Sequence, residues 1–415
     1  MLAKVASDPL FDPEVVEDPH AYYATLRAVD PVHELAGTGA FLVTRMDLIH
    51  EVVANPAVFS SVSTRFLHHR ANGEAPGLRS VLPSLDADQG SVLATADPPD
   101  HGRQRKVVTR RLSTSAMQAM EPEFRELVDG ILDSALEEGR IEWMSQLAEP
   151  LPMVMVARIL GVDDSLAPVL KSQGYASVEA ISGFVSDERL AELGTPMMDV
   201  GPVVDAYFDV RNAGNRDATS LIGVCAQAAE AGELTDLEAL AILFLLVSAG
   251  GESTTSLTGT GAQILAARPD LQDRLRREPH LVPAFVEEAC RVDPPFRGHY
   301  RRVVADTELG GVSIPAGSTL VLVWPAANRD RDVFPNPDEI DLDRPNPRQH
   351  VGFGWGIHLC VGAPLARIEA KVALEQLLSR TTTFSIEPSS APLRHHRSLM
   401  VRRLVDLPLV LEAAE

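Results

Sequence analysis

The sequence contains only three cysteines among 415 residues, at positions 225, 290 and 360. None of them has partner ligands at the short, regular spacing that a disulfide framework or a structural zinc site requires. The sequence therefore excludes a domain that is held together by disulfides or by zinc. Cys360 is either an inert thiol or a residue that acts alone.

Long apolar runs and net positive charge are also missing. The longest apolar run, Ala239 to Val247, has nine residues, well short of a membrane span. The first residues carry early acids and no apolar core of signal-peptide length. The formal net charge of −21 argues against non-specific nucleic-acid binding. We therefore expect a cytoplasmic protein with no membrane segment and no nucleic-acid partner, in a reducing compartment.

What is present is a large apolar fraction in helical patterns. Apolar residues make up 45% of the chain, enough for a large packed core. Residues 121–139 place an apolar stripe at helical spacing, and a capping box at Thr235 and Glu238 opens a helix that we expect to run to Pro269. Short strands are expected near residues 40 and 320. No linker or repeat divides residues 1–415, so we expect a single, mainly α domain with a small β-rich portion.

The stretch "GFGWGIHLCVGAPLAR", residues 352 to 367, surrounds Cys360 with glycines. Glycine allows positive φ and close approach of the backbone to a flat or bulky group. A helix is expected directly after the cysteine, with Pro364 in its first turn. The free N–H groups of that helix start should stabilise a thiolate. A lone thiolate in such a loop can ligate an iron whose in-plane ligands come from a macrocycle.

The whole string resembles the haem-binding signature of the cytochrome P-450 family. The matching positions are Phe353, Gly354, Gly356, His358, Cys360 and Gly362. The resemblance extends from "DPHAYYATLR" near the start to "RHHRSLMVRR" near the end. It implies the cytochrome P-450 fold with a long central helix. It also implies heme b (iron protoporphyrin IX) with Cys360 as the axial thiolate ligand and metal-binding residue.

The resemblance further implies residues that hold the haem propionates. "ADPPDHGRQRKVV" supplies His101 and Arg105, and arginine pairs well with carboxylates. A third partner is Arg301, with Arg302 as the alternative, and the fourth is His358. For each of these residues, the alternative interpretation is a surface charge.

In "EEACR", Glu288 and Arg291 lie on one helix face. In the family such a pair forms a buried ion-pair network with an arginine that precedes the cysteine loop. Arg344 in "LDRPNP" is placed for that role. We expect this network to be architectural.

The segment "SAGGESTTS" lies in the middle of the expected long helix, and the resemblance implies that Ala249 lies beside the haem and the substrate. Two adjacent glycines there cost about 1 kcal/mol each relative to alanine, which indicates close approach or a local opening of the helix. The family pattern assigns Glu252 as the acid and Ser253 as the alcohol that relay protons to dioxygen. Threonine usually fills the alcohol position, and Thr254 is the alternative here. Simple bonding of these hydroxyls to helix carbonyls remains a third interpretation.

The resemblance implies a monooxygenase that inserts one oxygen atom from O2 into an apolar, small-to-medium organic substrate, by hydroxylation or oxidative dealkylation. No reductase sequence is fused to the chain, so electrons are expected from a separate ferredoxin and an NAD(P)H-linked ferredoxin reductase. A basic patch is a candidate docking site for the ferredoxin, and scattered solvated charges are the alternative. Its members are Arg103, Arg105, Lys106, Arg110, Arg111 and Arg348.

Two other functions remain open at this point. One is a haem-thiolate enzyme that uses peroxide or isomerises its substrate, against which Glu252 and Ser253 argue. The other is a haem-dependent ligand binder or sensor. The substrate pocket is expected from residues 61–92, parts of 157–212, Ala249 and the "PPFRGHY" and "RSLM" segments. Arg297, His299 and Tyr300 either anchor a polar substituent or face the propionates.

Overall fold

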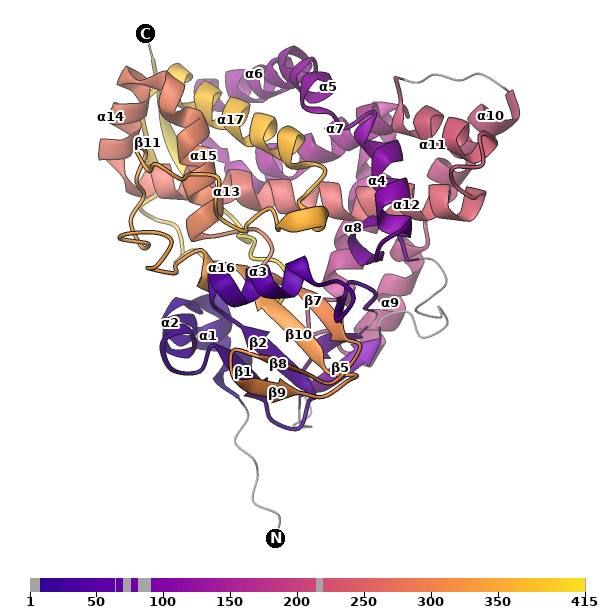
Figure 1. The fold of residues 1–415 in the computed structure, drawn as a ribbon. Coiled ribbons are helices and arrows are strands. Elements are labelled where there is room, and N and C mark those ends of the chain that lie inside the picture. Colours follow the sequence, from indigo (N-terminus) through magenta and orange to yellow (C-terminus); the bar gives the residue numbers. More distant parts are fainter. Residues whose placement is uncertain (1–7, 64, 70–75, 81–90, 214–218, 415) are drawn as a thin grey trace.

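The computed structural model describes residues 8–63, 65–69, 76–80, 91–213 and 219–414. Helices form the larger part of the molecule, and a smaller sheet lies against one side of them (Figure 1). The short helices α1 (Pro13–Glu17), α2 (His20–Val29) and α3 (Met46–Ala54) accompany the sheet. The expected mainly α fold with a small β-rich portion is confirmed.

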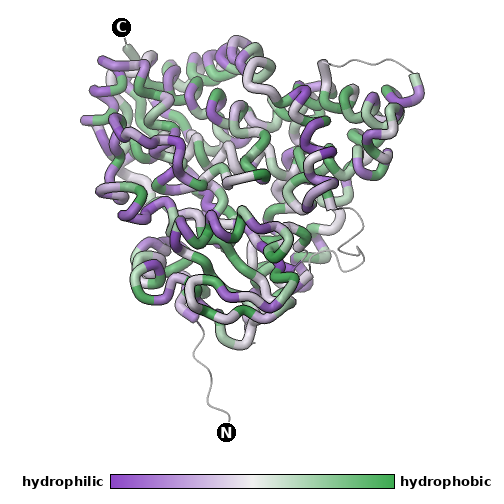
Figure 2. The backbone as a smooth tube through the Cα atoms, viewed as in Figure 1, coloured by the Kyte–Doolittle hydropathy of each residue, from purple (hydrophilic) through white to green (hydrophobic). Residues whose placement is uncertain are grey.

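The remaining helices follow one another along most of the chain. They are α4 (Asp100–Thr109), α5 (Thr114–Gln118), α6 (Glu121–Glu138), α7 (Pro150–Leu160), α8 (Ala167–Ala180), α9 (Asp187–Met197), α10 (Gly201–Ala213), α11 (Leu221–Glu230), α12 (Asp236–Gly250), α13 (Glu252–Ala267), α14 (Pro269–Arg277), α15 (Val282–Val292), α16 (Trp324–Ala327) and α17 (Ala363–Arg380). Hydrophobic segments concentrate in the interior of this assembly and hydrophilic ones at its outer helices and turns (Figure 2).

The largest sheet in the described part of the chain has the order β1-β2-β10-β7-β3. Its strands are β1 (Val32–Leu35), β2 (Ala40–Val43), β10 (Thr319–Val323), β7 (Gly298–Val303) and β3 (Phe59–Ser60). β10 is parallel to β2 and antiparallel to β7. Every residue of β10 is buried, as a central strand of continuous apolar sequence requires. Strands were expected near residues 40 and 320, and β2 and β10 confirm them.

Smaller sheets complete the β portion. They contain β4 (Arg65–His68) with β5 (Gly77–Ser80), β8 (Thr307–Leu309) with β9 (Val312–Ile314), and β11 (Thr381–Ile386) with β12 (Pro408–Ala413) and β6 (Arg140–Glu142). The third of these joins the segment between α6 and α7 to the last part of the chain. Segments that are far apart in sequence therefore meet beside the central helices.

Two helices begin where the sequence predicts them. α6 starts at Glu121 and buries Phe124, Val128 and Leu132 of the predicted stripe. α17 starts at Ala363, with Pro364 in its first turn, and its apolar side packs against α6 and α13. The start of α17 fixes the position of the cysteine loop against the core.

The long central helix expected from Thr235 to Pro269 is present as Asp236–Ala267, and the local opening that the double glycine indicates lies at Gly251, where α12 ends and α13 begins. The capping box at its start is present as predicted. A Cβ atom at Gly251 would lie 2.0 Å from the Met153 side chain, and one at Gly250 would lie 2.8 Å from that of Val156. The two glycines therefore allow α7 to approach at the point where the helix opens.

The segment Asp236–Ala267 satisfies the length and composition of a membrane span, with half of its most apolar stretch buried inside the structure. Figure 1 shows α12 and α13 crossing the middle of the helical part. This is the position of a core helix pair, and it brings the break at Gly251 into the interior.

Candidate haem-thiolate site

The cysteine loop turns sharply just before α17. Gly354 and Gly356 have φ angles of 73° and 67°, which side chains other than glycine rarely adopt. These turns allow the Cys360 N–H to donate to the Phe353 carbonyl at 2.8 Å. Cys360 is thereby held at the N-terminal end of α17.

Cys360 differs from the other two cysteines in its surroundings. Cys225 and Cys290 are buried, whereas the side chain of Cys360 is exposed. Enclosure by protein raises the pKa of the Cys360 thiol, and the N–H groups of Gly362 and Ala363 lower it. Burial raises the pKa of Cys225 to about 12. An accessible sulfur that faces helix N–H groups is what a metal-ligating thiolate requires.

Two imidazoles lie together beside the loop. The rings of His101 and His358 are 4.3 Å apart between centroids, and Nε2 of His358 lies 2.9 Å from Oγ of Ser61. Burial, then the charge of Arg301, lowers the pKa of His358 to about 3. The other ring nitrogen of His358, Nδ1, is buried without a partner among the described residues. Ser61 lies within the segment expected to line the pocket, but no local sequence pattern predicts its contact with His358.

A buried guanidinium without an anion lies in the same region. Arg301 is 5% exposed, and its Nη1 donates to the carbonyl of Tyr300 at 2.8 Å. Burial lowers its pKa to about 10, and it forms no ion pair within the described ranges. Burying such a charge is unfavourable unless it is paired. A carboxylate of a bound group, such as a haem propionate, fits this requirement.

Arg105, which was expected beside Arg301, lies next to the cysteine loop. Its Nη2 donates to the Leu359 carbonyl at 2.6 Å, and its positive charge lowers the pKa of Cys360. The structure therefore brings His101, Arg105, Arg301 and His358 together around Cys360. Phe353, Gly354 and Gly362 belong to the loop itself.

Neighbouring residues on β7 face opposite sides. His299 and Arg301 share one side, and their charges influence the same imidazole, His358. Tyr300 points the other way, where its hydroxyl accepts from the Leu67 N–H at 3.4 Å. Arg297 donates to the Val16 carbonyl at 2.5 Å. Arg297 and Tyr300 therefore belong to the core near α1, and His299 faces the site.

Glu252, at the start of α13, is buried and bound to an arginine from the C-terminal segment. The Nε of Arg403 lies 3.1 Å from its Oε1, and Nη1 of Arg403 lies 2.7 Å from Oε1 of Glu149. Glu149 in turn accepts from Lys171 at 2.5 Å. Burial raises the pKa of Glu252, and Arg403 lowers it. The expected acid is thus connected through charged groups to Lys171, which is one-third exposed.

The two candidate alcohols lie in different surroundings. Ser253 donates to the Ala249 carbonyl at 2.8 Å, across the break. Thr254 is buried and neighbours Glu369 of α17, whose pKa burial raises well above its ordinary value and the Thr254 hydroxyl lowers. One interpretation of these hydroxyls was that they bond to helix carbonyls, and Ser253 makes such a bond.

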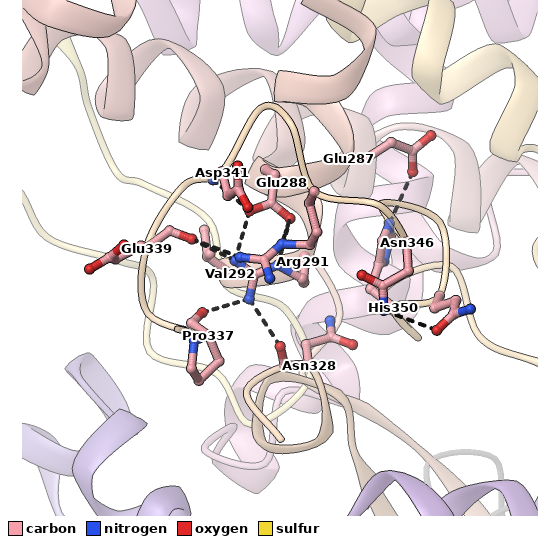
Figure 3. A network of polar contacts seen from close by, with 12 residues as sticks. Glu287, Glu288, Arg291, Val292, Asn328, Pro337, Glu339, Asp341, Asn346 and His350 are labelled. Carbon is pink, nitrogen blue, oxygen red and sulfur yellow. Dashed lines mark hydrogen bonds and ion pairs between the residues drawn. The ribbon is translucent and has the colours of Figure 1, made fainter. Parts of the chain in front are cut away.

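The expected architectural network is confirmed. Arg291 Nε and Nη2 donate to the two carboxylate oxygens of Glu288 at 2.7 and 2.9 Å, and Arg344 Nε donates to the same carboxylate at 2.9 Å. Arg291 also donates to the carbonyls of Asn328, Pro337 and Glu339 (Figure 3). The network ties α15 to the segment that leads to the cysteine loop.

The predicted basic patch is partly neutralised by carboxylates. Arg103 pairs with Glu238 at 2.5 Å, and Arg110 pairs with Glu233 at 2.6 Å. An open hollow of about 470 Å³ remains on this face. It is lined by Gly102, Arg105, Lys106, Thr109 and Arg110. The exposed side chains of Ile357 and Leu359 lie on the cysteine loop.

The thiol of Cys360 and the unpaired Arg301 are satisfied together by one ligand that carries a metal and carboxylates, and haem is such a ligand. Fold and site therefore define a haem-thiolate protein. Comparison with known proteins agrees: a family described as Cytochrome P450 matches residues 208–405. Cytochrome P450 144 of Mycobacterium tuberculosis is 38% identical over 415 residues, which cover 99% of this chain and 93% of that protein. The chain belongs to the cytochrome P450 family.

Other relatives and solved structures agree with this membership. The 6-deoxyerythronolide B hydroxylase of Saccharopolyspora erythraea is 30% identical over 94% of this chain and 95% of its own length. The crystal structure of myxobacterial cytochrome P450 CYP267B1 in complex with myristic acid has a TM-score of 0.85 at 30% identity and covers 97% of this chain and 99% of its own. The CalO2 crystal structure has a TM-score of 0.84 at 26% identity, with 97% and 98% covered. The protein is accordingly a monooxygenase-family oxidoreductase that binds haem through a cysteine thiolate.

Proposed function

We propose that residues 1–415 form one haem-thiolate domain that inserts one oxygen atom from O2 into an apolar, small-to-medium organic substrate. The reaction is a hydroxylation or an oxidative dealkylation. Electrons come from a separate ferredoxin and an NAD(P)H-linked ferredoxin reductase, and the enzyme acts in the cytoplasm. The proposal rests on one observation: the loop that turns at Gly354 and Gly356 places Cys360 at the start of α17.

In this proposal Cys360 is the axial ligand. The thiolate-ligated haem supplies dioxygen activation and attack on an unactivated C–H bond. His101, Arg105, Arg301 and His358 hold the propionates, which removes the cost of the buried, unpaired Arg301 charge. The rest of the loop and the central helix contact the macrocycle through Phe353, Gly354, Gly362 and Ala249.

Proton delivery is assigned to the helix break. Glu252 is the carboxyl that takes up and passes on a proton, because burial raises its pKa and so favours the protonated form. Ser253 presents a hydroxyl oxygen whose own hydrogen is used by the Ala249 carbonyl, so its lone pairs are free to accept. Thr254 faces α17 instead, which favours Ser253 as the alcohol.

Contacts between three of the segments expected to line the substrate pocket support this role, and residues 64, 70–75 and 81–90 of the first segment lie outside the described residues. The His69 N–H donates to the Gly183 carbonyl at 2.8 Å, and the Leu399 N–H donates to the Ser182 carbonyl at 2.7 Å. Leu399 is buried, as is Met400 beside it. An apolar lining of this kind favours an apolar substrate. The relatives named a 6-deoxyerythronolide B hydroxylase and a vitamin D(3) 25-hydroxylase support an organic small molecule as the substrate.

The electron donor is inferred from the face that carries Cys360. Arg105 and Lys106 line an open hollow there, and the exposed Ile357 and Leu359 lie on the same loop as the cysteine. On a chain with a net charge of −21, these cations form a local site for a small acidic iron–sulfur protein.

The test is a pair of measurements on purified holoprotein. The reduced protein exposed to carbon monoxide should show the red-shifted Soret band of thiolate ligation, and Cys360→Ser should lose it. Compounds that convert the iron from low to high spin should then support product formation with a ferredoxin, its reductase and NAD(P)H. Turnover with peroxide alone and none with the redox partners would identify a peroxide-using enzyme. Spin shifts without any turnover would identify a ligand binder.

A further inference from the structure

Glu287 precedes Glu288 of the architectural network. Its carboxylate is contacted by basic side chains from the segment around the cysteine. Its two carboxylate oxygens accept from Nε and Nη2 of Arg367 at 2.6 and 3.1 Å. His350 Nε2 lies 3.0 Å from the same carboxylate (Figure 3). The exposed Arg348 reaches it at 3.3 Å. The Glu287 side chain is 5% exposed, so the carboxylate at the centre of this cluster is buried.

Arg367 connects this cluster to the cysteine. Its guanidinium carbon lies 4.3 Å from the centre of the Phe353 ring, a cation–π arrangement. The Phe353 carbonyl accepts the 2.8 Å hydrogen bond from the Cys360 N–H. One guanidinium therefore contacts both the Glu287 carboxylate and the residue that holds the cysteine backbone.

The loop is also pressed directly against α15. A Cβ atom at Gly352 would lie 2.7 Å from Sγ of Cys290, and the Gly352 N–H donates to Nδ1 of His350 at 3.1 Å. His350 is thus bonded to Glu287 by one ring nitrogen and to the loop backbone by the other. Glu287 and Cys290, which both lie on α15, therefore determine how far the cysteine loop lies from this helix.

We infer that Glu287 is a positioning residue for the thiolate: it fixes Arg367 over Phe353, neutralises the Arg367 charge, and so sets the electron-donating strength of Cys360. The inference rests on the proposed role of Cys360 as the axial ligand. Groups around a metal ligand tune the metal through hydrogen bonds, charge and orientation. In a partly buried site a unit charge acts strongly over a few ångströms.

Electrostatics gives the two partners opposite effects. Removing the Glu287 charge leaves Arg367 uncompensated, which stabilises the electron-rich reduced site. Removing the Arg367 charge leaves Glu287 with only His350 and the exposed Arg348 beside it, which makes the site less positive and destabilises its reduced form. A purely structural role predicts instead that both changes loosen the loop in the same way.

The experiment measures the reduction potential of the haem iron in Glu287→Gln, Arg367→Gln and the double variant. We expect a shift to more positive potential in the first and to more negative potential in the second. The double variant should return towards the wild type. The C–O stretching frequency of the ferrous carbon monoxide complex should rise in Glu287→Gln and fall in Arg367→Gln. Arg367→Lys should keep the wild-type potential.

Glu121→Gln is the matched control. Glu121 accepts from Lys371 of the same helix α17 at 2.9 Å but does not contact the loop, so its variant should leave the potential unchanged. Shifts of the same sign in both single variants, or no shift in either, would overturn the inference. If Glu287→Gln does not retain haem, the Arg367→Lys and Arg367→Gln pair decides alone. If the wild-type protein lacks the red-shifted carbon monoxide band, the assignment of Cys360 as the iron ligand is refuted. That result is distinct from a failure of the inference about Glu287.

Discussion

The Ser253 hydroxyl donates a 2.8 Å hydrogen bond to the Ala249 carbonyl, and this bond spans the break between α12 and α13. It satisfies a carbonyl at the end of α12, where the opening at Gly251 interrupts the helix. The hydroxyl is therefore fixed in direction without a β-methyl group. In threonine the β-methyl group restricts the side-chain rotamer. In Ser253 this hydrogen bond restricts it instead.

Ser253→Ala should retain haem and substrate binding but divert electrons into hydrogen peroxide, because the hydroxyl that relays the proton is gone. Product formation should fall by about 100-fold, the lower end of the contribution of a positioned proton donor. Ser253→Thr should remain coupled, and Thr254→Ala serves as the control on the neighbouring hydroxyl. The measurement is product formed per NAD(P)H consumed, with peroxide assayed alongside. Uncoupling in Thr254→Ala alone would move the alcohol role by one residue.

Arg403→Gln should weaken both the fold and the proton supply. The substitution leaves the buried Glu252 without its cation, whereas Glu149 keeps Lys171, at a cost of about 3 kcal/mol in the free energy of unfolding. Arg403 lowers the Glu252 pKa against burial, so its loss should raise that pKa further. The pH profile of product formation should then move to higher pH. Arg394→Gln, at an exposed position in the same C-terminal segment, should change neither quantity.

Glu288→Gln should destabilise the protein in a pH-dependent way. Burial raises the pKa of Glu288, but the bonds from Arg291, the Asp341 backbone and Arg344 hold it below the ordinary 4.5. A lowered pKa contributes stability at neutral pH that is lost as the pH falls through the folded value. The deficit of the variant should be about 3–5 kcal/mol at neutral pH and should shrink below pH 4.5. Denaturant unfolding across pH measures it, with the exposed Glu339→Gln as the control.

Lys106→Glu should raise the KM for an acidic ferredoxin about fivefold, which corresponds to about 1 kcal/mol for one exposed charge. Substrate affinity, read from the spin shift, should stay constant. The effect should fade with ionic strength, because salt screens exposed charges. Arg277→Glu, the same charge change on the distant helix α14, is the control. Equal responses of the two variants, or turnover that does not depend on salt, would contradict docking at this face.

The parts of the site predictable from sequence rest on local patterns. The glycine spacing and Pro364 fix the loop and the start of α17, and both are found. Glu288 and Arg291 are one helical turn apart, so their pairing follows from spacing alone. The double glycine indicates close contact or an opening, and both occur at Gly250 and Gly251.

Contacts between distant segments were not predictable, because one sequence carries no signal for them. Arg403 meets Glu252 across 151 residues, and Ser61 meets His358 across 297. The sequence predicts Arg103 as a member of an exposed basic patch. In the structure it pairs with the carboxylate of Glu238, which lies 135 residues away in sequence. For the same reason Met153, on another helix, could not be identified from sequence as the residue that approaches the break at Gly251.

The C-terminal segment determines which contacts can form only after the chain has been synthesised almost to its end. Arg403 and β12 (Pro408–Ala413) complete the surroundings of Glu252 and the sheet of β6, which precede them by more than a hundred residues. A nascent chain still held at the ribosome with residue 403 inside the exit tunnel has a buried acid without its cation and a strand edge without its neighbour. Such edges are prone to aggregation. Ribosomes that stall late on this message should therefore yield chains that chaperones hold, and haem capture should follow release.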